Sequence, residues 1–184
     1  LVTLPLVIQS VSEGSISLET TVGDLLPDWK NSNKAKLTLR EMLSHYARLT
    51  PWIPFYKETL DDKGFVKKSM YQSKPSSKFS MMVAKDLFLK TGYEKELYDQ
   101  IKASALVDTL VYKYSDLPYY ILKKYFENLS KEPFNKLVEE RIFKPLDLNR
   151  ITYTPLDEFD PKQIVPSEID DYFRNRELDG YVHD

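Results

Sequence analysis

The apolar positions fall into short helical stripes separated by prolines and polar turns. Near the start of the chain the apolar residues recur at helical spacing, namely Leu4, Val7, Ile8 and Val11. Gly14 follows where a helix commonly ends. A second, one-sided stripe follows Asp116 and comprises Leu117, Ile121, Leu122, Tyr125 and Phe126. We therefore predict one helix before Gly14 and another after Asp116.

Shorter elements are predicted elsewhere. Thr38 is followed three residues later by Glu41, which is a capping box at the start of a helix. Pro133 opens another helix, because proline is favoured at the first helical position. The predicted helices are 22–26, 37–49, 93–104 and 133–143, and the predicted extended pieces are 85–89 and 107–113. Residues 61–78 look like an exposed excursion, and residues 145–184 show few periodic runs. With no internal repeat and no domain boundary, we predict a single mainly helical domain over residues 1–184.

Composition removes several classes of function. The 26 basic and 28 acidic residues are well mixed, which argues against a nucleic-acid surface. Cysteine is absent, so disulfides, thiol nucleophiles and thiolate metal sites are excluded. His45 and His183 are the two histidines, too few to favour a metal centre. The sequence contains no run of 18 apolar residues, so no membrane span is predicted. We expect no metal and no cofactor.

The triplet Tyr114-Ser115-Asp116 stands directly before the second stripe and has two interpretations. Ser115 or Asp116 could cap the helix, with Tyr114 simply packing against the domain. Alternatively, residues i and i+2 of an extended approach face the same side, so Tyr114 and Asp116 would share one pocket. A tyrosine beside ammonium groups can relay protons for a hydroxyl nucleophile.

Three stretches of the sequence resemble the serine β-lactamase and penicillin-binding-protein superfamily, particularly its class C and esterase-like branch. They are LPLVIQSVSEGSISLETTVGDLLPDW, KLTLREMLSHYARLTPWIPFY and YSDLPYYILKKYFENLSKEPFNKLVEERIFKPLDLNRITYTP. The stretch PWIPFYKETL is similar in sequence to domains of this superfamily that are fused to glycoside hydrolase family 3 enzymes in Bacteroidetes.

The resemblance implies the helical part of an α/β serine hydrolase fold, with the main antiparallel sheet largely missing. Tyr114 matches the proton-relay tyrosine of the Tyr-x-Asn motif, and Asp116 replaces its asparagine. That replacement adds a negative charge, which would hold a neighbouring lysine protonated. Trp52 and Tyr56 are candidates to line the substrate mouth.

Two further motifs of the superfamily have no counterpart in the chain. No serine is followed by lysine three positions later, so the Ser-x-x-Lys motif is expected just before Leu1. The third motif of the superfamily is Lys-Thr-Gly or His-Thr-Gly, and the resemblance places it well after Tyr114. Lys90-Thr91-Gly92 spells this motif but precedes Tyr114, so we interpret it as a turn into a helix. We therefore expect a central fragment that is inactive by itself. His45 is expected to bond nearby backbone, and His183 to be structural.

The resemblance also suggests partners. The complete hydrolase would act through an acyl-enzyme on a small ester or amide, a β-lactam or a peptidoglycan-like substrate, in an extracytoplasmic compartment such as the periplasm. We expect self-association through the apolar surface that faces the sheet in the family. The alternative function is a non-catalytic module that binds a glycan or a protein.

Overall fold

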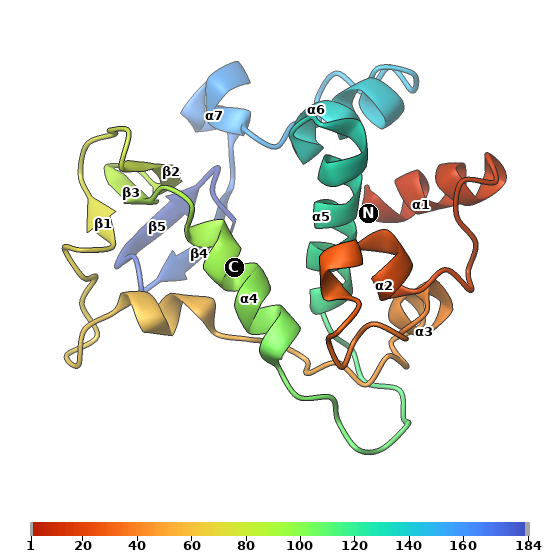
Figure 1. The fold of residues 1–184 in the computed structure, drawn as a ribbon. Coiled ribbons are helices and arrows are strands. Elements are labelled where there is room, and N and C mark those ends of the chain that lie inside the picture. Colours follow the sequence, from red (N-terminus) through yellow and green to blue (C-terminus); the bar gives the residue numbers. More distant parts are fainter. Residues whose placement is uncertain (1, 183–184) are drawn as a thin grey trace. The chain divides into compact units, whose positions relative to one another are not determined.

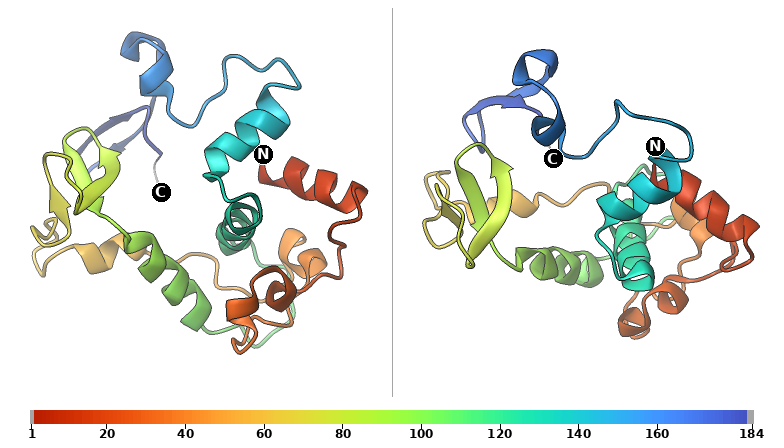
Figure 2. Two further views of the ribbon diagram at one scale, coloured as in Figure 1. Left: turned by 45° about the horizontal axis from the view of Figure 1, so that its top comes forward. Right: turned by 90° about the horizontal axis from the view of Figure 1, so that it is seen from above.

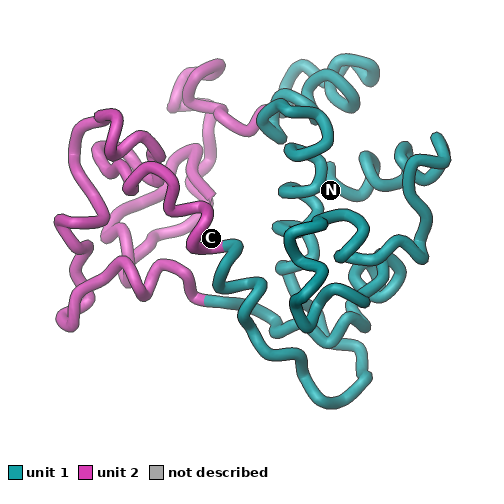
Figure 3. Tube along the Cα trace, in the orientation of Figure 1, with its two compact units in different colours: residues 1–53, 98–151 teal, residues 54–97, 152–184 magenta. Residues whose placement is uncertain are grey.

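The computed structural model describes residues 2–182 and divides the chain into two compact units. Unit 1 comprises residues 1–53 and 98–151, and unit 2 comprises residues 54–97 and 152–184 (Figure 3). Over the described residues, helices hold more of the chain than strands do, and the strands form a three-stranded and a two-stranded sheet. The chain is thus an α/β fragment, which agrees in part with the predicted fold class. The single domain and the missing main sheet stay predictions.

The first helix of unit 1, α1 (Thr3–Ser12), confirms the helix predicted before Gly14. Gly14 leaves the helix at φ +74°, in the left-handed region that glycine reaches without strain. The predicted apolar stripe is only partly correct. Leu4 and Ile8 are exposed, whereas Leu6 and Val7 are buried. The buried face of α1 differs from the predicted one because α1 contacts α5 (Leu117–Ser130) and η3 (Glu139–Phe143). Figures 1 and 2 show this arrangement.

Capping boxes begin two short helices of unit 1. In α3 (Leu39–Leu43) the Thr38 hydroxyl accepts a hydrogen bond from the Glu41 N–H, and the Glu41 carboxylate accepts one from the Thr38 N–H. Thr21 and Asp24 repeat this pattern at α2 (Val22–Leu25), which is followed by η1 (Pro27–Trp29). The predicted start of α3 is confirmed, but the helix ends six residues earlier than expected. The reason is that His45 and Arg48 adopt left-handed φ values of 61° and 57°.

The helix α5 forms the core of unit 1. Its predicted stripe is confirmed, because Leu117, Ile121, Leu122 and Phe126 are buried and the fifth member, Tyr125, is half-buried. Pro133 precedes α6 (Phe134–Val138), which continues as the π-helical turn η3 and confirms the helix predicted at 133–143. At 14 residues α5 is the longest helix among residues 2–182, and no helix in that range is long and apolar enough to cross a membrane.

Unit 2 contains a small antiparallel sheet that the sequence predicted only in part. After η2 (Phe55–Thr59), the strands β1 (Tyr71–Gln72), β2 (Phe79–Ala84) and β3 (Leu87–Lys90) pair in the order β1-β3-β2. The extended piece expected at 85–89 corresponds to β3 and the turn before it. Asp86 at φ 56° makes that turn, so β2 and β3 form a hairpin rather than one strand. The helix predicted at 93–104 is confirmed as α4 (Tyr93–Ala103).

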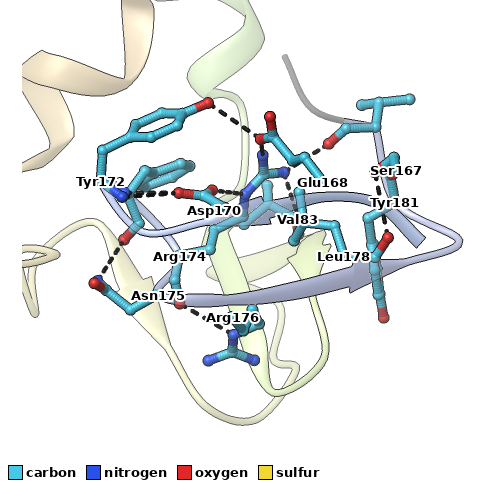
Figure 4. Close-up of polar contacts among 12 residues, drawn as sticks. Val83, Ser167, Glu168, Asp170, Tyr172, Arg174, Asn175, Arg176, Leu178 and Tyr181 are labelled. Carbon is cyan, nitrogen blue, oxygen red and sulfur yellow. Dashed lines mark hydrogen bonds and ion pairs between the residues drawn. The ribbon is translucent and has the colours of Figure 1, made fainter.

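A second hairpin in unit 2 was not predicted from the sequence. After α7 (Pro155–Glu158) and η4 (Pro161–Gln163), strands β4 (Pro166–Asp170) and β5 (Arg176–Asp179) pair antiparallel. A buried ion pair holds the connection, with Arg174 Nε 2.5 Å from Asp170 Oδ2 (Figure 4). Asp170 Oδ1 also accepts the N–H of Phe173 at 2.8 Å. The charges are therefore paired and hydrogen-bonded, as buried charges must be.

A buried lysine joins α4 to the segment after η1 in unit 1. Lys34 is fully buried, and its ammonium donates to Asn33 Oδ1 at 2.9 Å and to the carbonyls of Lys102 and Ser104 at 3.3 Å and 2.5 Å. These carbonyls lie at the C-terminal end of α4, where backbone acceptors lack partners within the helix. Burial lowers the pKa of Lys34 to about 8.

We predict that stability rises with pH because of Lys34. Between pH 8 and 10.5 the unfolded chain binds more of this proton than the folded chain does, so the penalty of burying the ammonium is relieved as pH rises. In urea unfolding at several pH values, the free energy of unfolding of the wild type should rise relative to that of Lys34→Met by at most about 1.4 kcal/mol per pH unit. Lys36→Met, at an exposed position, is the control. A pH-independent difference between wild type and Lys34→Met would contradict the prediction.

Candidate active site

The loop after α3 (residues 45–51) is hydrogen-bonded to the segment that leads into α5 (residues 112–116). Both belong to unit 1, and several hydrogen bonds join them across about 65 to 70 residues of sequence. The donors and acceptors are Lys113 N to His45 O (2.9 Å), Ser115 N to His45 Nδ1 (3.4 Å), Ser115 Oγ to Thr50 O (2.7 Å) and Asp116 N to Pro51 O (3.4 Å). The backbone on both sides of Tyr114 is therefore fixed before α5 begins.

Ser115 provides the helix cap. Its side chain is buried, and Oγ accepts the N–H of Leu117 at 3.2 Å while donating to the carbonyl of Thr50. Asp116 has no capping hydrogen bond from its side chain. The capping interpretation is thus correct for Ser115 and wrong for Asp116, whose carboxylate has another partner.

Tyr114 and Asp116 lie on the opposite side of the segment from Ser115. Tyr114 is 55% exposed, and its hydroxyl donates to Asp116 Oδ1 at 2.8 Å. The i, i+2 argument from the sequence therefore described their placement correctly. The hydrogen bond and the negative charge of Asp116 raise the pKa of Tyr114 above its usual value. Tyr114 is accordingly a neutral phenol at physiological pH in this arrangement.

His45 contacts both the segment and the tyrosine ring. Its Nδ1 accepts the Ser115 N–H, so the expectation that His45 bonds nearby backbone is confirmed. The His45 ring also contacts the Tyr114 ring, with centroids 4.6 Å apart. Because Nδ1 is an acceptor, the proton of the neutral imidazole lies on Nε2. We assign His45 a positioning role.

The other two predicted site residues belong to different units. Trp52 belongs to unit 1 and is 52% exposed, one residue after Pro51. Tyr56 belongs to unit 2, where its ring lies 5.3 Å from Phe173 and 5.7 Å from Tyr172. Tyr56 therefore packs within an aromatic cluster of its own unit. Substrate-binding roles for Trp52 and Tyr56 stay predictions.

The Lys90-Thr91-Gly92 sequence is a turn into a helix, as predicted. Lys90 ends β3, Gly92 turns the chain at φ +83°, and α4 begins at Tyr93. His183 and Asp184 lie outside the described residues.

Two aromatic residues beside the site were missed by sequence reasoning. The Tyr112 ring lies 5.9 Å from His45 and 6.0 Å from Tyr46. The alternation of Tyr112 and Tyr114 in an extended segment was the signal that could have identified the first of them, because both then point to one side. Nothing in the local sequence around Tyr46 distinguishes it from the other tyrosines.

Comparison with known proteins gives a consistent result. The family model described as Beta-lactamase matches residues 1–165. A Salmonella agona protein named "Putative D-alanyl-D-alanine carboxypeptidase" is 29% identical over 180 residues, covering 94% of this chain and 35% of that protein. The chain therefore spans about a third of the length of the curated relatives that it matches.

Solved structures with low sequence identity share the fold. An octameric penicillin-binding protein homologue from Pyrococcus abyssi aligns with TM-score 0.61 and 17% identity, over 98% of this chain and 37% of the other. A class C beta lactamase from Rhodobacter sphaeroides aligns with TM-score 0.51 and 15% identity, over 97% of this chain and 45% of the other.

We predict that Ser115→Ala destabilises the fold by about 1–2 kcal/mol. The substitution removes a cap acceptor and leaves the carbonyl of Thr50 without its donor. Denaturant unfolding measures the change, and Ser12→Ala, at an exposed serine in the last turn of α1, is the matched control. Equal effects of the two substitutions would refute the role of Ser115.

We also predict that Asp116→Asn lowers the pKa of Tyr114 toward about 10, because it removes the carboxylate that raises that pKa. The pKa can be followed by NMR of protein labelled with ¹³C at the tyrosine rings, with Tyr114→Phe identifying the signal. An unchanged titration curve in Asp116→Asn would rule out the carboxylate as the cause.

Proposed function

The chain belongs to the beta-lactamase family, and on that premise we propose that Tyr114 and Asp116 form one wall of a serine hydrolase active site. The observation that carries the proposal is the 2.8 Å hydrogen bond from Tyr114 Oη to Asp116 Oδ1 at the start of α5. The family resemblance assigns this pair to the Tyr-x-Asn motif, which supports the proposal. The tyrosine is exposed, as a residue that meets substrate must be.

In the proposed reaction an ester or amide is cleaved through an acyl-enzyme. The serine of a Ser-x-x-Lys motif attacks the carbonyl carbon while its proton passes to Tyr114, acting as phenolate. The tyrosine then gives that proton to the leaving group as the carbonyl–leaving-group bond breaks. Water hydrolyses the acyl-enzyme by the same relay. No Ser-x-x-Lys occurs within the 184 residues, so we propose that the chain by itself does not turn over substrate.

Asp116 gives this site a distinctive charge requirement. Among residues 2–182 no group donates a hydrogen bond to Asp116 Oδ2, so this oxygen is open to a further donor. We propose that the ammonium of the motif lysine occupies it. The positive charge would offset the carboxylate and restore a lower pKa to Tyr114. The aspartate would keep that lysine protonated, which leaves Tyr114 as the base.

The relatives support a proposal for the substrate class. A carboxypeptidase name among them supports a peptidoglycan-like amide, and the family as a whole supports small esters and amides. An extracytoplasmic location and a fused glycosidase domain are further proposals from the family resemblance. The exposed side chains of Leu4 and Ile8 on α1 support the proposed self-association.

We predict that Tyr114→Phe lowers kcat by about 10²- to 10⁴-fold in the protein that carries this chain together with a Ser-x-x-Lys motif, because a general acid–base group is lost. Release of p-nitrophenol from an ester and opening of a chromogenic cephalosporin are suitable readouts. Tyr153→Phe is the control, at an exposed tyrosine of unit 2. Full activity of Tyr114→Phe would overturn the role of Tyr114 in the reaction. No activity in the wild type would favour the alternative, a non-catalytic binding module.

A further inference from the structure

Three exposed tyrosines adjoin the candidate active site in unit 1. Tyr46, Tyr112 and Tyr114 are 44%, 60% and 55% exposed, although tyrosine rings carry a large apolar surface. Contiguous exposed apolar surface is uncommon on soluble domains and commonly marks a binding site.

The rings form a continuous series. Tyr46 meets Tyr112 with centroids 6.0 Å apart at 68°, and Tyr112 meets His45 at 5.9 Å and 85°. His45 then meets Tyr114 at 4.6 Å and 42°. We call these four residues the aromatic strip. Its separations and tilts fall within the range that aromatic pairs prefer, so each ring helps to orient the next.

The backbone under the strip is fixed by hydrogen bonds. Lys113 N donates to the carbonyl of His45, and Ser115 N donates to His45 Nδ1. Lys113 and Ser115 alternate with Tyr112 and Tyr114, so the two tyrosine rings lie on one side of the segment. Ordering these rings therefore costs little conformational entropy when a ligand binds to them.

The strip ends at the hydrogen bond between Tyr114 and Asp116. A ligand spread along it would place one end beside the groups proposed to react. The exposed tyrosine rings offer faces and edges for aromatic contacts, which a small molecule with a ring would match.

We propose that the aromatic strip is a substrate subsite that binds a flat, uncharged ring carried by the ester or amide. Tyr112 is its central contact, because it touches both Tyr46 and His45. Tyr46 and Tyr112 are therefore specificity residues, and they do not take part in bond making. The assignment as a substrate subsite rests on the proposed hydrolase function, whereas ring binding itself does not.

Ring binding can be tested without turnover. Protein labelled with ¹³C at the tyrosine rings is titrated with phenylacetamide and with hexanamide, an aliphatic amide of similar size. We expect saturable shifts of the Tyr46 and Tyr112 signals with phenylacetamide, and binding of hexanamide at least about three-fold weaker.

Variants assign the binding to the strip. Tyr112→Ala should weaken the binding of phenylacetamide about three- to ten-fold. Tyr112→Phe, which keeps the ring, should retain that binding. Tyr153→Ala is the control, since Tyr153 is also an exposed tyrosine but belongs to unit 2 and not to the aromatic strip. Equal binding of the two amides, or no effect of Tyr112→Ala, would overturn the proposal.

A second measurement separates the subsite from the reaction. In the complete protein, phenylacetamide should compete with the ring-free ester methyl acetate, whose hydrolysis is followed by proton release, and its inhibition constant should follow the NMR affinity in each variant. Ring binding without inhibition would overturn the substrate role. If the wild type hydrolyses no ester, the proposed function fails, and the NMR titration still decides ring binding.

Discussion

The hydrogen bond from the buried hydroxyl of Ser115 to the carbonyl of Thr50 fixes where everything else in the candidate site lies. The same oxygen accepts the first free N–H of α5, so one side chain joins a loop, a segment and a helix. Because side chains alternate along the segment, burying Ser115 forces Tyr114 toward solvent and Asp116 to the same side. The reactive geometry is thus a consequence of a structural contact made by the residue between them.

The site is also incomplete in charge. The carboxylate of Asp116 stabilises the protonated phenol of Tyr114, which is the opposite of what a proton acceptor requires. A cation from elsewhere in the protein would reverse this effect. Under the proposed function, aspartate in place of the asparagine of Tyr-x-Asn would make Tyr114 more dependent on the positive charge of a neighbouring lysine.

The sequence predicted the elements that local chemistry determines. The capping box at Thr38, the buried stripe of α5 and the proline start of α6 are all encoded within a few residues, and all three are present. Features that depend on distant contacts were not predictable. Which face of α1 is buried depends on α5 and η3, and the β4–β5 hairpin is held by the Arg174–Asp170 pair and by contacts of Phe173 with Tyr56 and Tyr71.

The same division applies to the site. Spacing alone placed Tyr114 and Asp116 together, because period two is a property of any extended segment. The early end of α3 at Leu43 could not be read from the sequence, since residues other than glycine seldom adopt the left-handed φ found at His45 and Arg48. Those two turns carry the loop to the segment that it supports.

The order of the units along the chain has one more consequence. Residues 54–97 interrupt unit 1 in sequence, so Thr50 and Ser115 are linked through a long intervening stretch. The entropy of closing such a loop grows only logarithmically, by about 0.6 kcal/mol for each doubling of its length. Evolution could therefore insert or delete residues in the exposed turn at 61–65, which precedes β1, at little thermodynamic cost to the segment that presents Tyr114. That segment itself can be assembled only after synthesis has passed residue 115.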